Sequence, residues 1–264
     1  MDEIARFNLD RWTALRAAGA PFTRPWLDLD TETSRLRLDP DGKLGEIRGR
    51  RVLCLASGGG QQAPAFALLG AEVTTLDLSP EQIERDREAA TRYGCRIQAQ
   101  EGDMRDLSRF GAASFDIVWH GYSLGFVPDA GQVFDQVARV LRPGGRYVFM
   151  CANPFVLGMG TADWAGDGYV LRQPYLDGAE VAFHDENWVA GSAASVPAPR
   201  EFRHTLGALV EGLSENGFVL DALEESTHAL PEAEPGSWEH FTTFAPPWLR
   251  LWCLHRPDVL PGSV

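Results

Sequence analysis

The sequence predicts an α/β protein with a Rossmann-like doubly wound sheet of about seven strands, mostly parallel with an antiparallel last strand. Three observations predict this fold. Short apolar runs alternate with helical patterns over residues 51–151, three glycines directly follow the first apolar run, and 44% of the 264 residues are hydrophobic. Strands that alternate with helices favour a parallel sheet, because right-handed crossovers place the ligand loops together at the carboxyl ends of the strands.

The whole chain, residues 1–264, is expected to form a single domain in four parts, of which residues 1–44 form an N-terminal helical cover. Apolar side chains at mostly helical spacing predict a helix from Asp2 to Ala18. Glycine and proline directly after Ala18 end it, and the segment 39–42 predicts a turn.

Residues 45–153 are expected to be the cofactor-binding core. The expected strands run over 51–56, 72–77, 96–100, 115–119 and 146–151, and the expected helices over 61–69, 80–93 and 132–141. Ser79 is the expected N-cap of the second of these helices, with Pro80 at its first position and Gln82 completing a capping box. The run Pro143-Gly144-Gly145 is expected to stop the third helix before the fifth strand begins.

The pattern changes after this core. Residues 154–203 are rich in glycine, proline and aromatic side chains and are too long for a plain connection, so we expect a folded insertion that covers the site as a lid. Residues 204–264 predict a final helix over 205–216 and two closing strands over 218–223 and 248–254. Trp12 and Trp26 are expected to help close the site from the N-terminal side.

Composition and charge disfavour several classes of protein. No apolar run reaches the roughly 18–20 residues of a membrane span, and the N-terminus is acidic where a signal peptide would be basic, so we expect a cytoplasmic protein without a membrane partner. The formal net charge of −13 would repel phosphate backbones and disfavours nucleic acid as a partner. The cysteines, which form no C-x-x-C pair, are expected to be buried free thiols: Cys54, Cys95, Cys151 and Cys253.

The main functional signal lies where the first strand meets its helix, in the run Ala56-Ser57-Gly58-Gly59-Gly60-Gln61. Glycines let the backbone approach a ligand closely because no Cβ intervenes. The helix beginning near Gln61 points free N–H groups and the positive end of its dipole at this turn. Asp77 ends the neighbouring strand and can accept both hydroxyls of a ribose. Turn and acid together predict an adenosine cofactor without saying which one.

Two cofactors fit this motif almost equally well. The spacing of Gly58, Gly60 and Ala63, followed by Asp77, matches the dinucleotide fingerprint G-x-G-x-x-A and would suit an NAD-dependent oxidoreductase. Such an enzyme needs a catalytic group such as a Tyr-x-x-x-Lys pair, and the single lysine, Lys43, precedes the nucleotide fold. A protein that binds the cofactor without performing any transfer is a further alternative that the sequence leaves open.

Three later motifs favour a different cofactor. Asp103-Met104 follows the third strand, where an acid can bind an adenine amino group and the apolar side chain can pack on its ring. Phe115–Trp119 is the fourth strand, and Val140–Gly145 precedes the fifth. In this order residues 50–153 resemble the class I S-adenosylmethionine-dependent methyltransferases. The chain is most similar to small-molecule methyltransferases related to ubiquinone/menaquinone C-methylases, and among them to a bacterial group of unassigned substrate that carries the turn Leu55–Gln62.

The resemblance implies S-adenosyl-L-methionine as the cofactor, S-adenosyl-L-homocysteine as the product, and roles for the matching positions. The methionine part of the cofactor would lie on the turn, formed by Ala56, Ser57, Gly58, Gly60 and Gln61. Asp77 would bind the ribose, and Leu78 would pack on the adenine. Asp103 would reach the adenine amino group with Met104 beside it, and His120 would border the methionine moiety and face the substrate.

Two positions depart from the pattern of these methyltransferases. Ala56 stands at the usual first glycine of the turn, and Cys54 stands where the first strand often carries an acid. Alanine is small enough to fit. The missing acid removes one anchor for the methionine ammonium, so we expect carbonyl groups after the first and fourth strands to replace it.

Methyl transfer to a small-molecule acceptor is expected to be an in-line displacement, with the nucleophile held within about 3–3.5 Å and water excluded. A general base is needed only if the acceptor must lose a proton. The expected bases are His120 and Tyr122, which could instead only line the pocket, and His184, which could be a surface histidine. No metal site is expected. The acceptor atom (carbon, nitrogen, oxygen or sulfur) and the oligomeric state stay open.

Overall fold

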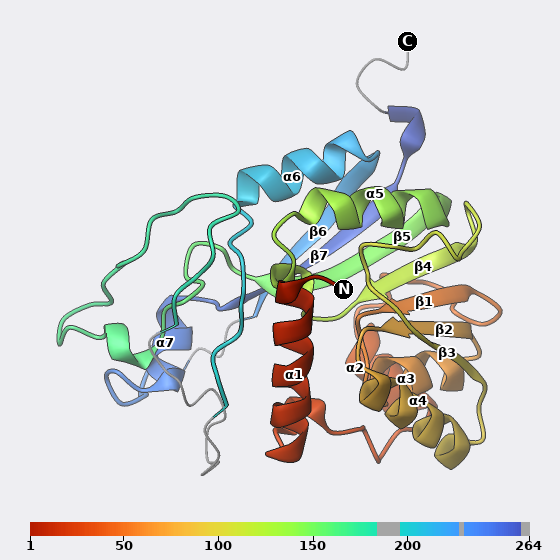
Figure 1. The fold of residues 1–264 in the computed structure, drawn as a ribbon, viewed down its shortest axis with the longest axis horizontal. Coiled ribbons are helices and arrows are strands. Elements are labelled where there is room, and N and C mark those ends of the chain that lie inside the picture. The colour runs from red at the N-terminus through yellow and green to blue at the C-terminus, as the bar shows by residue number, and fades with distance from the viewer. Residues whose placement is uncertain (184–195, 227–229, 260–264) are drawn as a thin grey trace.

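A seven-stranded sheet crosses the molecule in the order β3-β2-β1-β4-β5-β7-β6 (Figure 1). The computed structural model describes residues 1–183, 196–226 and 230–259. All neighbouring strands from β3 to β5 are parallel, and β7 runs antiparallel to both β5 and β6. This confirms the predicted doubly wound fold. The strand order reverses between β1 and β4, and parallel sheets bind their ligands beyond the strand ends at such a point.

The strands lie where the sequence predicts them, with ends that differ. They are β1 (Arg51–Leu55), β2 (Glu72–Asp77), β3 (Ile97–Glu101), β4 (Phe115–His120), β5 (Leu141–Ala152), β6 (Phe218–Ser226) and β7 (Trp248–His255). The run 143–145, expected to stop a helix before the fifth strand, lies inside β5 instead. The pairing of β4 with β5 shifts register between Phe115 and Ile117, which accommodates these residues.

Seven α-helices and several short 3₁₀ turns accompany the sheet in the described residues. The α-helices are α1 (Glu3–Ala17), α2 (Thr31–Leu38), α3 (Gln62–Leu68), α4 (Pro80–Tyr93), α5 (Ala130–Val140), α6 (Leu206–Glu215) and α7 (Trp238–Phe244), and the 3₁₀ turn η2 (Leu124–Phe126) borders the site. The helices α2 and α7 were not predicted. Both are short, and α2 begins at a reciprocal capping box between Asp30 and Thr33 rather than at an apolar periodicity.

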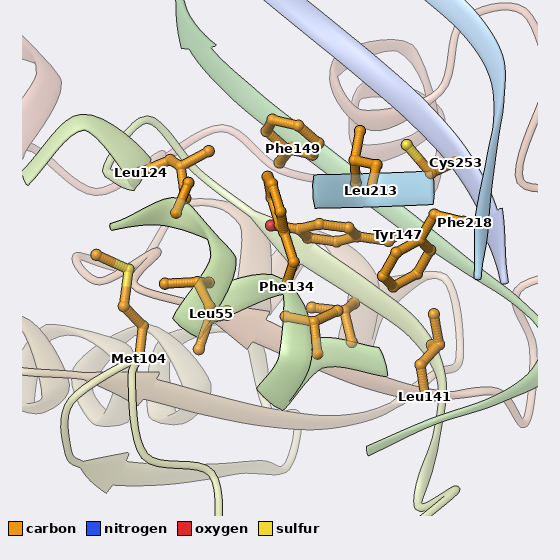
Figure 2. Packing of buried hydrophobic residues seen from close by; sticks show 14 of the residues in the cluster. Leu55, Met104, Leu124, Phe134, Leu141, Tyr147, Phe149, Leu213, Phe218 and Cys253 are labelled. Atoms are coloured by element: carbon orange, nitrogen blue, oxygen red, sulfur yellow. The ribbon is translucent and has the colours of Figure 1, made fainter. Parts of the chain in front are cut away.

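Helices cover both faces of the sheet (Figure 1). On one face α5 and α6 bury Phe134 and Leu213 against Tyr147 of β5, as Figure 2 shows. On the other face α2 and α3 pack against β1, β4 and β7, where Phe66 meets Trp119 at a ring-centroid distance of 5.4 Å. Burial of large apolar side chains on both faces stabilises the sheet, by about 1.5–3 kcal/mol for each side chain fully removed from water.

The predicted start of α4 is correct in its cap and wrong in its capping box. The Ser79 hydroxyl accepts the backbone N–H of Gln82, as an N-cap should. The Gln82 side chain does not return the bond, because a carboxylate oxygen of Asp77 accepts the Ser79 N–H at 2.9 Å. Asp77 at the end of β2 therefore accepts the hydrogen bond that a capping box would assign to the Gln82 side chain.

The insertion, described over residues 154–183 and 196–203, has little regular structure. Isolated bridges join Trp164 to Tyr169 and Glu180 to Phe202. His184 lies outside the described residues, so its predicted role has no structural counterpart here. All four cysteines are free, and three are buried as expected, but Cys95 is partly exposed at the end of α4. In the described part of the chain, no helix combines the length and apolarity that crossing a membrane requires.

Candidate active site

A cavity of about 330 Å³ lies at the carboxyl ends of β1, β2 and β4. Helix α1 stands beside these strand ends and supplies one wall (Figure 1). The opposite wall consists of the turn after β1, the end of β2 and the loops after β3 and β4. The lining is largely apolar and aromatic, and it includes Leu9, Trp12, Phe22, Leu78, Met104, Phe126, Met150 and Trp248. The volume suits a small organic ligand.

The turn after β1 has a backbone that requires small residues. Ala56 has a φ of +43°, Gly59 +114° and Gly60 +74°, so the chain passes through left-handed conformations. A Cβ at Gly58 would lie 2.4 Å from the Gln82 Cβ and 2.6 Å from a carboxylate oxygen of Asp77. Gly58 therefore allows the turn to pack directly against the end of β2.

Asp77 is fixed by backbone donors at the edge of the cavity. One carboxylate oxygen accepts the Gly58 N–H at 2.8 Å, and the other accepts the Ser79 N–H at 2.9 Å. Burial raises the pKa of Asp77 above its ordinary value, and these backbone hydrogen bonds oppose the rise. The side chain lines the cavity with its orientation already set, as a carboxylate that binds a ribose requires.

A second acid, Asp86 of α4, lies beneath the glycine turn. Its side chain is fully buried, and one carboxylate oxygen accepts the Gly60 N–H at 2.7 Å. Burial raises the pKa of Asp86 to about 7. Sequence reasoning missed this residue, although Asp86 falls between Ile83 and Ala89 at helical spacing on the buried face of α4. An acid is thus present next to Cys54, the position where β1 itself lacks one.

The turn also places two polar side chains on the cavity, of which one lacks a partner in the described structure. The Ser57 hydroxyl is buried at the cavity wall without a hydrogen bond. Gln61 lines the cavity too, and its side-chain amide donates to the carbonyls of Phe22 and Arg24 at 3.0 and 2.7 Å. A buried hydroxyl without a partner is costly, so a ligand with polar atoms at this end of the cavity fits the residues present.

The loop after β3 places the predicted adenine-binding residues on the same cavity. Asp103 and Met104 both line it, and Leu78 lies on the neighbouring loop. Arg105 pairs with Asp103 at 2.6 Å and with Asp2 at 2.5 Å, so this loop is tied to the start of α1. The apolar side chains and the acid have the chemistry of an adenine site, and the ion pairs hold the acid in place.

His120 lies behind the cavity wall and is not among the residues that line it. Its side chain is 1% exposed, with one ring nitrogen 2.7 Å from the Ser123 hydroxyl and the other 2.9 Å from the Tyr147 hydroxyl. Burial lowers the pKa of His120 to about 3, so the ring is neutral near pH 7. The predicted contact with substrate would have to pass through Ser123, which does line the cavity.

Tyr122 lines the cavity and is hydrogen-bonded to an acid that the sequence did not reveal. Its hydroxyl donates to a carboxylate oxygen of Glu201 at 2.5 Å. Glu201 is fully buried and lies near the end of the insertion, while Arg11 of α1 is also buried and lines the cavity nearby. No local pattern marks Glu201, because the contact joins residues separated by 79 positions.

The remaining predicted features have mixed outcomes. Trp12 lines the cavity, whereas Trp26 does not and instead donates its backbone N–H to the Gly60 carbonyl at 3.1 Å. None of the described residues of the insertion is part of the cavity lining. Glu201 contacts the cavity lining through the hydroxyl of Tyr122. Within residues 1–183, 196–226 and 230–259 no group of three or more histidines, cysteines or acids could hold a metal ion.

Comparison with known proteins identifies the kind of chain that carries this site. Residues 53–149 match the model of a methyltransferase domain family. An uncharacterized methyltransferase of Bacillus subtilis, YbaJ, is 35% identical over 68% of this chain and 69% of its own length. A ubiquinone biosynthesis O-methyltransferase of Xylella fastidiosa is 35% identical, and the match covers 58% of this chain and 64% of that protein.

Solved structures agree with these sequence relatives. An S-adenosylmethionine-dependent methyltransferase from Mesorhizobium loti superposes with a TM-score of 0.62 at 25% identity, over 84% of this chain and 96% of that one. The expected cofactor, S-adenosylmethionine, is confirmed by these relatives. Neither the oxidoreductase nor the non-catalytic alternative finds support among them.

Proposed function

Because the chain belongs to the class I S-adenosylmethionine-dependent methyltransferases, we propose that it methylates a small-molecule acceptor by in-line displacement. One observation carries this proposal: the glycine turn, Asp77 and Asp103 come from three successive strand ends and meet on one largely apolar cavity. That cavity is a few hundred Å³ in volume, which suits a small acceptor beside the cofactor better than a macromolecule.

The residues of this chain divide the binding of the cofactor among them. Asp77, held by the Gly58 and Ser79 N–H groups, would accept the ribose hydroxyls. Asp103 would accept the adenine amino group, with Leu78 and Met104 against the ring. The carbonyls and the Ser57 hydroxyl of the turn would bind the methionine part, and the buried Asp86 would hold that turn in shape.

S-adenosylmethionine supplies a methyl group already activated by its positively charged sulfur. The protein must align the acceptor and exclude water, which together contribute several kcal/mol to lowering the barrier. Trp12, Phe22 and Phe126 form an edge-to-face group in the wall, with centroid distances of 5.8 Å and 6.2 Å from Trp12. Aromatic faces exclude water and tolerate a positive charge.

His120 acts in this proposal as a positioning residue. Its neutral ring lies against the hydroxyls of Ser123 and Tyr147 and fixes the start of the loop that carries Tyr122. Tyr122 then remains the predicted residue with direct access to an acceptor. The net charge of −13 disfavours nucleic acid as the acceptor, because it would repel phosphate groups. The four free cysteines fit a cytoplasmic location.

Calorimetric titration with S-adenosylmethionine, S-adenosylhomocysteine and NAD tests the cofactor site. We expect micromolar binding of the first two and none of NAD, and a loss of at least about tenfold in affinity in Asp77→Asn, because a neutral amide binds the two ribose hydroxyls less well. Asp77→Asn keeps the shape of the side chain and so limits misfolding.

Asp135→Ala is the matched control, since Asp135 is an exposed acid on α5 away from the cavity. Its affinity for S-adenosylmethionine should equal that of the wild type. Binding of NAD alone would contradict the proposal and return Gly58, Gly60 and Asp77 to a dinucleotide site.

A further inference from the structure

The contact between Tyr122 and Glu201 joins a cavity-lining tyrosine to a buried carboxylate. The Tyr122 hydroxyl donates to one oxygen of Glu201 at 2.5 Å, a length typical of charge-assisted O–H···O⁻ bonds. The second oxygen of Glu201 is buried and has no hydrogen-bond partner in the described structure. The carboxylate therefore has free acceptor capacity, and its connection to the cavity runs through Tyr122.

Close packing around the Glu201 carboxylate restricts its position. A Cβ at Gly125 would lie 2.6 Å from a Glu201 oxygen, so glycine in η2 makes room for the acid. The backbone N–H of Phe202 donates to the Gly125 carbonyl at 2.7 Å and fixes the segment that carries Glu201. These contacts hold the Glu201 carboxylate directly beside the Tyr122 side chain.

The charged and titratable groups around Glu201 come from three elements. Arg11 on α1 provides a positive charge, Tyr122 follows β4, and the Cys151 thiol lies on β5. Burial raises the pKa of Glu201 to about 7, while the Tyr122 hydroxyl and Arg11 oppose the rise. A carboxylate of this kind both holds and releases a proton near neutral pH, which is what a proton acceptor in catalysis requires.

The wall beside Tyr122 indicates the shape of the group that would meet it. The ring centroid of Phe126 lies 6.1 Å from that of Tyr122 and 6.2 Å from that of Trp12, and both pairs are edge-to-face. These aromatic side chains line the same cavity. Beside Tyr122 they form a largely apolar wall, and a planar aromatic ring bearing a polar substituent matches it.

We propose that Tyr122 and Glu201 form a proton-accepting pair, and that the acceptor is an aromatic hydroxyl compound methylated on oxygen. The inference rests on the proposed methyltransferase function. A phenolic hydroxyl attacks poorly until it loses its proton, whereas a neutral amine attacks with its own lone pair and a thiol ionises more readily. A proton-accepting pair therefore benefits a phenolic acceptor more than an amine or a thiol.

The proposed step balances in atoms and charge. The acceptor O–H bond breaks as its proton moves to the Tyr122 oxygen, and the Tyr122 proton moves to Glu201. The electron pair of the acceptor oxygen forms the new O–CH₃ bond, and the C–S bond that breaks leaves its pair on sulfur. The products are a methyl ether, S-adenosylhomocysteine and a protonated Glu201, which returns its proton to water.

The test measures S-adenosylhomocysteine formation from S-adenosylmethionine with phenol, catechol, benzylamine and 2-mercaptoethanol across the range from pH 5 to pH 9. We expect turnover of the phenols at a kcat/KM at least about tenfold above the amine and the thiol, with an inflection near pH 7. Tyr122→Phe and Glu201→Gln should lower kcat on catechol by about 100-fold, leave KM within about threefold, and remove the inflection.

Two variants control for the loss of a hydroxyl and of a buried carboxylate. Tyr169→Phe removes a hydroxyl that contacts His240, and Asp163→Asn neutralises a buried acid paired with Arg172. Neither residue lines the cavity, so both variants should keep the pH profile of the wild type. Melting temperatures and calorimetric affinities for S-adenosylmethionine report whether each variant is folded.

The outcomes separate this inference from the proposed function. Turnover of benzylamine or 2-mercaptoethanol in preference to the phenols overturns the acceptor class. So does a wild type that binds S-adenosylmethionine and methylates neither phenol. Activity of Tyr122→Phe and Glu201→Gln within threefold of the wild type overturns the pair. Failure of the wild type to bind S-adenosylmethionine instead overturns the methyltransferase proposal itself.

Discussion

The two sides of the cavity are built in different ways. The cofactor side uses residues from successive strand ends, and Asp77 contacts Gly58 only 19 positions away along the chain. The acceptor side joins Tyr122 to Glu201 across 79 positions and Arg11 to the Pro197 carbonyl across 186. The first side is a property of a βαβ unit, and the second depends on how α1 and the end of the insertion pack onto that unit. Binding of the cofactor and recognition of the acceptor should therefore respond separately to substitution.

Gly58→Ala should produce the largest effect, and it should weaken cofactor binding without changing the acceptor side. The new Cβ would lie 2.4 Å from the Gln82 Cβ and 2.6 Å from the Asp77 carboxylate, so either the turn or Asp77 must move. We expect calorimetry to show a loss of at least about 100-fold in affinity for S-adenosylmethionine, roughly 2.7 kcal/mol.

Gly207→Ala is the matched control for Gly58→Ala, because a Cβ at Gly207 in α6 meets open space. It should leave the affinity unchanged and add up to about 1 kcal/mol of stability. Normal cofactor binding by Gly58→Ala would show that the turn is not held against Asp77 as described.

Asp86→Asn should change how stability depends on pH, because the acid under the turn is fully buried. Its folded pKa, about 7, lies above the ordinary value of 3.8, so its ionisation opposes folding. In the wild type this contribution is fully favourable below about pH 4 and is lost as pH rises through 7.

The amide cannot ionise, so denaturant unfolding should show Asp86→Asn gaining roughly 2–4 kcal/mol relative to the wild type between pH 4 and pH 8. The exposed Asp135→Asn supplies the control and should follow the wild type. Parallel stability curves for Asp86→Asn and the wild type would mean that Asp86 ionises as freely in the folded protein as in water.

Arg11→Met should have the smallest effect and act on the acceptor side. Removal of this positive charge raises the pKa of Glu201 further above about 7, since Arg11 opposes the effect of burial. The inflection of kcat/KM on catechol should move to higher pH, and the rate at pH 7 should fall by about tenfold.

The affinity of Arg11→Met for S-adenosylmethionine should stay within threefold of the wild type, because Arg11 contacts Pro197 near the end of the insertion rather than the glycine turn. Arg16→Met, at the last turn of the same helix, is the control. An equal loss of cofactor affinity and acceptor turnover would show that the two sides are not independent.

The sequence predicted much of the core and less of its surroundings. The mostly parallel doubly wound sheet, the glycine turn and the acids at positions 77 and 103 were predicted because hydrophobic periodicity and turn chemistry act over short stretches. The helix α2 was missed because it is short and carries a weak apolar pattern, and α7 was missed because it has only seven residues. Gln82 was assigned to a capping box because the sequence does not show that Asp77 reaches the Ser79 N–H first.

The sequence by itself determined that this chain folds as a doubly wound sheet and binds S-adenosylmethionine. Both properties depend on short motifs that follow one another within one stretch of about a hundred residues. The tertiary structure alone decided that Asp86 lies under the turn, that His120 lies behind the wall, and that Glu201 meets Tyr122. These contacts depend on which buried faces pack together across long separations in sequence. No local spacing encodes such a choice, so the acceptor side becomes visible only in the folded chain.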